Sequence, residues 1–324
     1  MLLQVALPLA LGSALLGASP QTKTPAFEDF LKEVRKEAAA KGLSDATLQA
    51  LDGLTVIEKV IEQDRRQPSS TMTFERYLQI ILTEERISEG RRLLAEHRAE
   101  LEEITKRYGV PPEIIVALWG IESKFGNIMG DHPVLGALAT LAWEGRRASF
   151  FRKELFNALT ILEQGHIDAA SMKGSWAGAM GQCQFMPSTF LRHSADGDGD
   201  GKRDIWGSKP DVFASAANYL AKIGWDKGSR WGREVKLPEK FDPAHAGMKN
   251  KKPKSLAAWR KLGVTLASGE PLPDDGQKAW LLRPDGKTGP AVLAYPNVRV
   301  ILDWNRSQYF AAGVGLLADR ISAP

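Results

Sequence analysis

Apolar and charged positions alternate at helical spacing over the first third of the chain. Between Ile87 and Arg107, apolar residues recur every three or four positions among glutamates, arginines and lysines, which is typical of an amphipathic surface helix. The whole segment 27–108 shares this texture and is predicted to be helical. The same spacing predicts further helices over 150–164, 212–222 and 308–321.

The texture changes between residues 226 and 296, where prolines, glycines, lysines and short apolar runs take over. Short strands are predicted at 279–282, 291–293 and 298–302, with a turn at Asp285-Gly286. The pattern as a whole therefore predicts a mainly α, α+β fold with a small β-containing insertion.

The N-terminus has the pattern of an export signal. The first 22 residues carry no charged side chain, and Leu2 to Ala18 is largely apolar. This predicts a signal peptide over residues 1–19, although the usual basic start is missing. The stretch is short for a membrane span and is interrupted by Pro8 and Gly12, so we expect no span in the mature chain. No cysteine lies near the junction, which argues against a lipoprotein anchor. The prediction is a periplasmic protein, with an uncleaved anchor as the alternative.

The composition is that of an ordinary globular protein of 324 residues, with 43% hydrophobic and 25% charged residues. The net charge is +4, and its 43 basic residues are spread along the chain. Nucleic-acid binding would need a denser basic patch, whereas an anionic polymer substrate is compatible with this charge. A single cysteine, Cys183, excludes an intramolecular disulfide, and the five histidines lack the spacing of zinc ligands.

One glutamate, Glu122, is predicted to face apolar neighbours on a helix. Prolines at the start and a glycine at the end mark a helix over residues 111–126. At helical spacing, Glu122 shares a face with Ile115, Leu118 and Phe125. Burial there would raise the pKa of the carboxyl, so that it holds a proton near neutral pH as a general acid must. The alternative is a surface glutamate at the edge of the apolar stripe.

A glycine-rich run at 174–187 reads Gly-Ser-Trp-Ala-Gly-Ala-Met-Gly-Gln-Cys-Gln-Phe-Met-Pro. Its small residues allow the backbone to approach a ligand or another segment closely. Ser175, Gln182 and Gln184 offer uncharged donors and acceptors, which the hydroxyl and acetamido groups of a sugar require. A tight helix–helix crossing would use the same small residues, so the run alone leaves both interpretations open.

Several motifs, in this order along the chain, resemble the lytic murein transglycosylase B family. They are Tyr-Gly-Val-Pro-Pro-Glu-Ile-Ile at 108–115, Glu-Ser-Lys-Phe-Gly at 122–126, Leu-Ala-Thr-Leu at 138–141, Arg146-Arg147, the run at 174–187 and Ala-Asn-Tyr-Leu at 217–220. The resemblance covers the chain after about Ala26. It implies a lysozyme-like catalytic core over 108–225, an N-terminal helical lobe over 26–107, a small β-containing lobe over 226–298 and a C-terminal return to the core over 299–324.

The resemblance also implies a reaction. In that family the glutamate at the position of Glu122 is the sole catalytic acid/base, and the MurNAc–GlcNAc β-1,4 bond of peptidoglycan glycan strands is cleaved. The muramoyl 6-hydroxyl is the internal nucleophile, so the product has a 1,6-anhydro end and catalysis uses no cofactor. The implied substrate-binding residues are Tyr77, Arg146, Arg147, Ser175, Gln184, Tyr219 and Asn305. Trp304 and Cys183 stand where relatives often have tyrosine and glycine.

Other activities stay open at this point. A second carboxylate near Glu122 is not excluded, and Asp131, Glu144 and Asp168 are candidates. A hydrolytic muramidase would use Glu122 with water, and a non-catalytic peptidoglycan-binding module would keep only the groove. Other cell-wall enzymes are candidate partners.

An acidic loop, Asp-Gly-Asp-Gly-Asp-Gly-Lys-Arg-Asp at 196–204, begins like an EF-hand calcium loop. Position 12 of that pattern is Gly207 rather than glutamate, and the resemblance implies that a later aspartate closes the loop. The predicted ligands of a structural calcium are the side chains of Asp196, Asp198, Asp200 and Asp211 and the carbonyl of Lys202. The alternative is a solvated acidic turn.

Overall fold

The computed structural model describes residues 26–66, 72–144, 146–249, 251–286 and 289–323. These residues form two compact units, each built from two separate segments of the chain. We call residues 26–66 and 122–216 unit A, and residues 72–121 and 217–323 unit B. This division cuts across the lobe boundaries expected from the sequence. The predicted signal peptide at 1–19 lies outside the described residues.

Unit A is built around two packed helices. Its elements are α1 (Phe27–Ala40), α2 (Asp45–Leu48), η1 (Gln49–Leu51), α3 (Glu58–Arg65), β1 (His132–Pro133), α8 (Val134–Trp143), α9 (Ala148–Glu163), β2 (Lys173–Gly174) and α10 (Pro187–His193). α8 is apolar on every side and is buried because α9, α3 and α1 pack around it. α10 and α2 pack on α9, and β1 pairs antiparallel with β2. Two further helices, α7 (Pro112–Ser123) and α11 (Lys209–Lys222), each contribute residues to both units.

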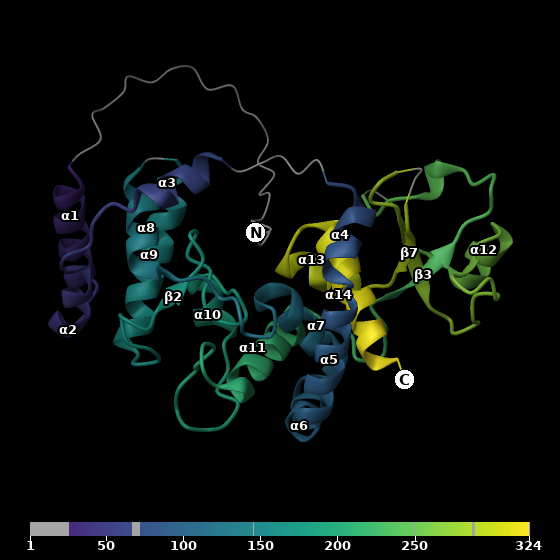
Figure 1. The fold of residues 1–324 in the computed structure, drawn as a ribbon, viewed down its shortest axis with the longest axis horizontal. Coiled ribbons are helices and arrows are strands. Elements are labelled where there is room, and N and C mark those ends of the chain that lie inside the picture. The colour runs from purple at the N-terminus through teal and green to yellow at the C-terminus, as the bar shows by residue number, and fades with distance from the viewer. Residues whose placement is uncertain (1–25, 67–71, 145, 250, 287–288, 324) are drawn as a thin grey trace, which may run out of the picture. The chain divides into compact units, whose positions relative to one another are not determined.

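Unit B combines helices with the sheet. Its elements are α4 (Phe74–Ile81), α5 (Glu84–Glu96), α6 (Arg98–Tyr108), β3 (Gly232–Lys236), η2 (Pro243–His245), β4 (Lys254–Ser255), α12 (Leu256–Lys261), β5 (Thr265–Leu266), β6 (Lys278–Leu282), β7 (Ala291–Ala294), α13 (Asn297–Trp304) and α14 (Gln308–Ser322). α14 packs against α4, α5, α13 and β3 (Figure 1). Its glycines permit this close packing, since a Cβ atom on Gly315 would lie 2.0 Å from Cδ2 of Trp231.

The sheet of unit B has five antiparallel strands in the order β4-β6-β7-β3-β5. Leu293 of β7 stands between Leu281 of β6 and Arg233 of β3 in the register. A separate apolar core forms with α12, and Trp259 and Tyr295 are its largest members. This core holds the small lobe together.

The mainly α, α+β fold is confirmed. Helices occur throughout 27–108, and those predicted over 150–164, 212–222 and 308–321 appear as α9, α11 and α14. The strands predicted at 279–282 and 291–293 appear as β6 and β7. Among the residues that the structure describes, no helix is long and apolar enough to span a membrane.

Three local predictions were wrong. The residues predicted as one helix from Ile87 to Arg107 form two, α5 and α6, because the backbone leaves helical geometry at His97. The helix predicted over 111–126 ends at Ser123.

The third error is the strand predicted at 298–302, which is the helix α13. The alternation of Val298, Arg299 and Val300 imitates a strand. The buried side chain of Asn297 settles the local structure, because its Nδ2 donates to the carbonyl oxygens of Asp226 and Ser229 at 2.9 and 2.8 Å. Its Oδ1 also accepts from the backbone N–H of Asp226 at 2.8 Å. These contacts fix the start of α13 through residues distant in sequence, which a local pattern does not reveal.

Candidate active site

Glu122 lies in the last turn of α7 and is half-buried. The helix ends at the next residue, Ser123, and Lys124, Phe125 and Gly126 follow with φ angles of 49°, 58° and 82°. Phe125 therefore stands in a left-handed turn and not on the helical face predicted for it. The Ser123 hydroxyl accepts from the backbone N–H of Gly126 at 3.0 Å. Such unfavourable backbone persists only where surrounding contacts impose it, and it concentrates at functional sites.

Gln182, from the glycine-rich run, packs closely against Gly126 in this turn. A Cβ atom on Gly126 would lie 2.3 Å from Oε1 of Gln182, so only glycine fits. Gln182 is 2% exposed, and its Nε2 donates to the carbonyl of Trp206 at 2.6 Å. Its Oε1 accepts from Nζ of Lys209 at 3.2 Å. Gln182 thus joins the turn after Glu122 to the segment that follows the acidic loop.

Cys183 is the next residue in the run and is buried. Its thiol lies 3.4 Å from the carbonyl oxygen of Val212, toward which the S–H donates. Burial raises the pKa of the thiol, and the charges of Glu122 and Asp211 raise it further. The thiol is therefore kept protonated and is a packing group. The two carboxylates also lie close enough to the sulfur for their charges to act on it.

Ser175 and Gln184 are both ordered by hydrogen bonds inside the run. The Ser175 hydroxyl accepts from the backbone N–H of Ala179 at 3.0 Å. Gln184 has a positive φ of 50°, and its Nε2 donates to the carbonyls of Met129 and Gly181, both at 2.9 Å. The structure therefore places these two predicted substrate residues in unit A, on the same rigid run that contacts the turn after Glu122.

Arg146 and Arg147 share one buried partner that the sequence did not reveal. Asp64 of α3 is 1% exposed, and its Oδ1 lies 2.5 Å from Nη2 of Arg147. Its Oδ2 lies 3.3 Å from Nε of Arg146. Arg147 has a positive φ of 59° and also stacks over the Phe151 ring. No spacing signal links Asp64 to residues 82 and 83 positions later, so only the fold could identify this pairing.

The remaining predicted substrate residues, Tyr77, Tyr219 and Asn305, belong to unit B and are held by contacts within it. The Tyr77 ring packs beside that of Tyr309, at 5.9 Å between centroids. The Tyr219 hydroxyl donates to the carbonyl of Asp303 at 3.0 Å, and Oδ1 of Asn305 accepts from the backbone N–H of Ser307.

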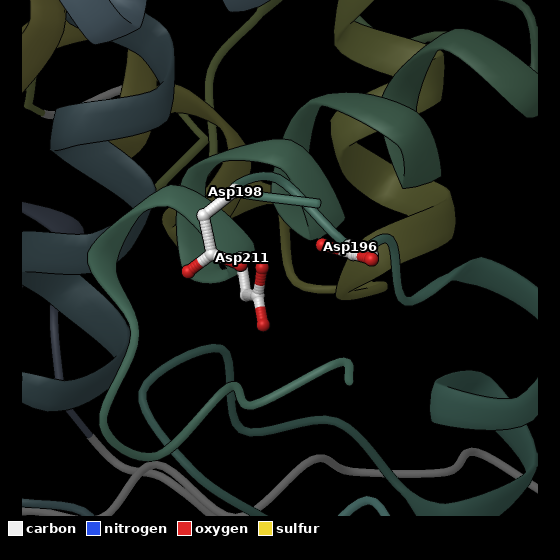
Figure 2. A group of neighbouring side chains, drawn as sticks. All are labelled: Asp196, Asp198 and Asp211. Atoms are coloured by element: carbon white, nitrogen blue, oxygen red, sulfur yellow. The ribbon is translucent and has the colours of Figure 1, made fainter. Parts of the chain in front are cut away.

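The acidic loop gathers three of its predicted ligands. Carboxylate oxygens of Asp196, Asp198 and Asp211 lie within 4.8 Å of one another, with Asp211 on the first turn of α11 (Figure 2). Asp200 lies on the same loop outside this group, where its Oδ1 accepts from the backbone N–H of Lys202 at 2.7 Å. The Lys202 carbonyl stays a predicted ligand.

Two carboxyls of this loop differ in their surroundings, and the backbone N–H groups of Gly201 and Gly199, which donate to Asp196, lower the pKa of that carboxyl. Burial raises the pKa of Asp211, and the charges of Asp198 and Asp196 raise it further. The backbone N–H groups of Gly197 and Asp204 donate to Asp211 and oppose that shift. A carboxylate that is buried among like charges, with oxygen donors only, suits a hard divalent cation.

Two of the three candidate second carboxylates have partners elsewhere. Glu144 accepts from Nε and Nη2 of Arg65 at 3.2 and 2.8 Å. Asp168 is exposed, and the backbone N–H of Ser171, which donates to it, lowers its pKa. Asp131 is exposed on the segment before β1. Glu144 is therefore engaged by Arg65, and Asp168 by the backbone of Ser171.

The class of protein follows from comparison with known families. Residues 26–319 match the transglycosylase SLT domain family, and the chain belongs to that family. The resemblance seen in the motifs and the expected lysozyme-like fold are thus confirmed.

Individual relatives of known sequence and structure support the same family assignment. The chain is 34% identical over 254 residues to the membrane-bound lytic murein transglycosylase B of Escherichia coli K12, which covers 76% of this chain and 67% of that protein. The crystal structure of SltB3 from Pseudomonas aeruginosa, in complex with NAG-anhNAM-pentapeptide, is 45% identical. It matches with a TM-score of 0.87 over 92% of this chain and 80% of that one. Escherichia coli Slt35 in complex with calcium is 30% identical, with a TM-score of 0.75 and 93% of each chain covered.

Proposed function

We propose that this chain is a peptidoglycan lytic transglycosylase that cleaves the MurNAc–GlcNAc β-1,4 bond and leaves a 1,6-anhydro-MurNAc end. Membership of the family and the activities named for its relatives support the reaction class. The observation that carries the residue assignment is the position of Glu122. It is a half-buried carboxyl in the last turn of a helix, and the left-handed turn that begins two residues later packs through Gly126 against the buried Gln182.

The proposed chemistry needs one carboxyl in two roles. Protonated Glu122 donates its proton to the glycosidic oxygen as the bond from that oxygen to C1 of MurNAc breaks. The resulting carboxylate then removes the proton of the muramoyl 6-hydroxyl, whose oxygen forms the new bond to C1. The proton balance closes, and Glu122 returns to its protonated form without any water being consumed.

This route differs from that of most glycosidases, which use two carboxylates. An internal hydroxyl has a high effective molarity, so neither an enzymic nucleophile nor an activated water is required. The engagement of Glu144 with Arg65 and the exposure of Asp168 support a single-carboxyl mechanism. Ser175, Gln184, Arg146 and Arg147 would bind the glycan and its peptide, and we propose the same for Tyr77, Tyr219 and Asn305 of unit B.

We also propose a structural calcium ion held by Asp196, Asp198 and Asp211, with Asp200 and the Lys202 carbonyl as further ligands. The crowded carboxylates and the burial of Asp211 support a cation here, as does the calcium complex of Slt35. The ion would neutralise the loop and fix it to the start of α11. It has no proposed part in the chemistry.

The cellular site that we propose is the periplasm. The apolar segment at 1–19 and the cell-wall substrate named for the relatives support export, and the relative from Escherichia coli is membrane-bound. Fractionation of cells that express the full chain, before and after removal of residues 2–19, tests this proposal. Recovery of the full chain in the cytoplasm would contradict it.

The direct test of the catalytic residue is Glu122→Gln, which keeps the size of the side chain and removes its titrating proton. Release of muropeptides from purified sacculi should fall to the background rate while the circular dichroism spectrum and melting temperature are retained. Glu113→Gln, on the first turn of the same helix α7, is the matched control and should keep its activity. Substantial turnover by the Glu122→Gln protein would refute the assignment.

A further inference from the structure

The last turn of α3 meets the residues between α8 and α9 in a small network of charged side chains, which we call the clasp. Its members are Asp64, Arg65, Glu144, Arg146 and Arg147. One arm of the clasp joins Asp64 to the two later arginines, and the other joins Arg65 to Glu144. All five residues belong to unit A, so the clasp is complete within one compact unit.

The two arms differ in burial and therefore in strength. The side chain of Asp64 is 1% exposed, whereas that of Arg65 is 66% exposed. An ion pair with an exposed member is screened by water and contributes little to stability. A buried carboxylate, in contrast, is strongly unfavourable once it loses its partners. The Asp64 arm is therefore the one that orders the arginines.

Arg147 is bonded firmly to Asp64. Its Nη2 donates to Oδ1 of Asp64 at 2.5 Å, and its guanidinium lies 4.9 Å from the centre of the Phe151 ring. The φ of 59° at Arg147 is unfavourable for a residue with a Cβ atom and persists only where surrounding contacts impose it. The bond to Asp64 and the packing on Phe151 are such contacts.

Arg146 is held more loosely, and part of its guanidinium stays available. Its side chain is 48% exposed, and its Nε lies 3.3 Å from Oδ2 of Asp64 without the geometry of a hydrogen bond. Oδ2 is buried and accepts no hydrogen bond from the described residues, which is costly, so turning the Nε–H of Arg146 toward it is favoured. That orientation leaves the two Nη groups, for which the described residues provide no partner.

The clasp has one positive charge in excess, since three arginines face two carboxylates. Glu144 is paired with Arg65, whose charge it balances. Asp64 is bonded to Arg147, so the surplus lies at Arg146. Two N–H groups on one edge of a guanidinium match the two oxygens of a carboxylate. The Nη edge of Arg146 therefore suits a carboxylate, and in peptidoglycan the peptide stems carry such groups.

We propose that Asp64 is a positioning residue, which aims the Nη edge of Arg146 at a carboxylate of a peptide stem. The stem as ligand rests on the proposed function, because that function makes peptidoglycan the substrate. Asp64 itself touches no substrate in this arrangement. Its loss removes a negative charge, which by charge alone should strengthen the binding of an anionic ligand, whereas loss of the aim of Arg146 should weaken it. The sign of the change in affinity separates the two effects.

The test measures binding apart from cleavage, in the full chain with Glu122→Gln. The ligand is a soluble GlcNAc–MurNAc tetrasaccharide whose peptide stems have free carboxylates, and it is titrated by calorimetry. Asp64→Asn should raise the dissociation constant by about tenfold, the size of one lost hydrogen bond to a charged group. Glu144→Gln removes the same charge from the other arm of the clasp and should leave the dissociation constant unchanged. Unchanged or tighter binding by the Asp64→Asn protein would overturn the proposal.

The stoichiometry of binding separates positioning from a general loss of structure. A role in stability alone would lower the fraction of protein that binds and leave the dissociation constant of that fraction unchanged, and this result would overturn the proposal. If the Asp64→Asn protein does not fold, Arg147→Lys takes its place, because it keeps every charge but lacks the Nη2 group that holds Asp64. Unchanged binding by that variant would be equally decisive against the proposal.

Two further comparisons test the route through Arg146 and the carboxylate. Arg146→Lys keeps the charge but loses the Nη edge, so it should weaken binding, and adding Asp64→Asn to it should cause no further loss. The same fragment with amidated stem carboxylates should bind about tenfold more weakly, and Asp64→Asn should then have no effect on it. A full further loss in either comparison would show that Asp64 acts by another route.

Failure of the proposed function would be seen separately from failure of this inference. Cleavage of the tetrasaccharide by the Glu122→Gln protein would refute the catalytic assignment and leave the measured role of Asp64 in place. Absence of any binding by the Glu122→Gln protein would overturn the role of Asp64, while the products formed by the unaltered chain would still report its reaction.

Discussion

Gly126→Ala should damage both the stability and the activity of this protein, because two separate costs meet at this position. An alanine with a φ of 82° costs about 1 to 2 kcal/mol relative to glycine. Its Cβ atom would also lie 2.3 Å from Oε1 of Gln182, so the Gln182 side chain must move. Moving it breaks the bond to the buried carbonyl of Trp206, and an unsatisfied buried group costs about 1 to 3 kcal/mol. The total loss of unfolding free energy should be about 2 to 5 kcal/mol.

Activity should fall as well, because Gly126 lies four residues after Glu122. A displacement of about 1 Å in a catalytic group can cost about a hundredfold in rate, so turnover of sacculi should fall by roughly tenfold to a hundredfold. Urea unfolding, followed by circular dichroism and tryptophan fluorescence, gives the stability change, and release of soluble muropeptides gives the rate.

Gly42→Ala is the matched control. Gly42 is in the same unit with a φ of 84°, but a Cβ atom there meets nothing within 4 Å. It should cost only the backbone term of about 1 to 2 kcal/mol and leave turnover unchanged. In a Gln182→Ala background, Gly126→Ala should likewise cost only that term. Fully additive effects of the Gly126 and Gln182 changes would show that the clash does not exist and would refute this reasoning.

Four other experiments test separate parts of the protein. Asp64→Asn should lower the free energy of unfolding, measured in urea, by about 2 kcal/mol. This is less than the loss expected for a fully buried ion pair, because Arg147 is partly exposed. An unchanged midpoint of urea unfolding would contradict the pairing of Asp64 with the arginines. Calcium should raise the melting temperature of the chelator-treated protein, and Asp198→Ala should erase this rise, whereas a rise that persists in the variant would place the ion elsewhere. The folded protein should resist thiol reagents even at mildly alkaline pH, because burial raises the pKa of Cys183 and keeps its thiol protonated. Rapid labelling of Cys183 without unfolding would contradict this prediction. Ser175→Ala should lower turnover by only about tenfold, because it removes hydrogen bonds and no proton transfer, and complete inactivation of a folded variant would indicate a nucleophilic serine.

Local sequence pattern predicted the segments whose secondary structure depends mainly on residues close in sequence. The local pattern of 150–164 and 308–321 was sufficient because the first segment forms a helix with one buried face and the second a helix that is apolar and buried over nearly its whole length. It failed at 298–302, where Asn297 binds residues about 70 positions away in the chain. The same limit explains why Asp64 was missed. Its role depends on a contact between α3 and the start of α9, and no spacing encodes that contact.

In the site, too, local motifs predicted some residues and missed contacts that depend on the fold. The motifs predicted Glu122, Ser175 and Gln184 as site residues through their resemblance to the family to which the chain belongs, and these assignments stay predictions. They did not reveal that Gln182 carries the contact with Gly126, since Gln182 looks equivalent to Gln184 in sequence. Only the fold separates the two, with Gln182 bonded to Trp206 and Gln184 bonded to Met129.

Product analysis in ¹⁸O-labelled water tests the central claim most directly. Purified sacculi are digested by the full chain, and the released muropeptides are examined by mass spectrometry without chemical reduction. If Glu122 directs attack by the muramoyl 6-hydroxyl, every new MurNAc end is a 1,6-anhydro sugar, lighter by one water than a reducing end and free of ¹⁸O. New reducing ends that carry ¹⁸O would show that water is the nucleophile, and the protein would then be a hydrolytic muramidase.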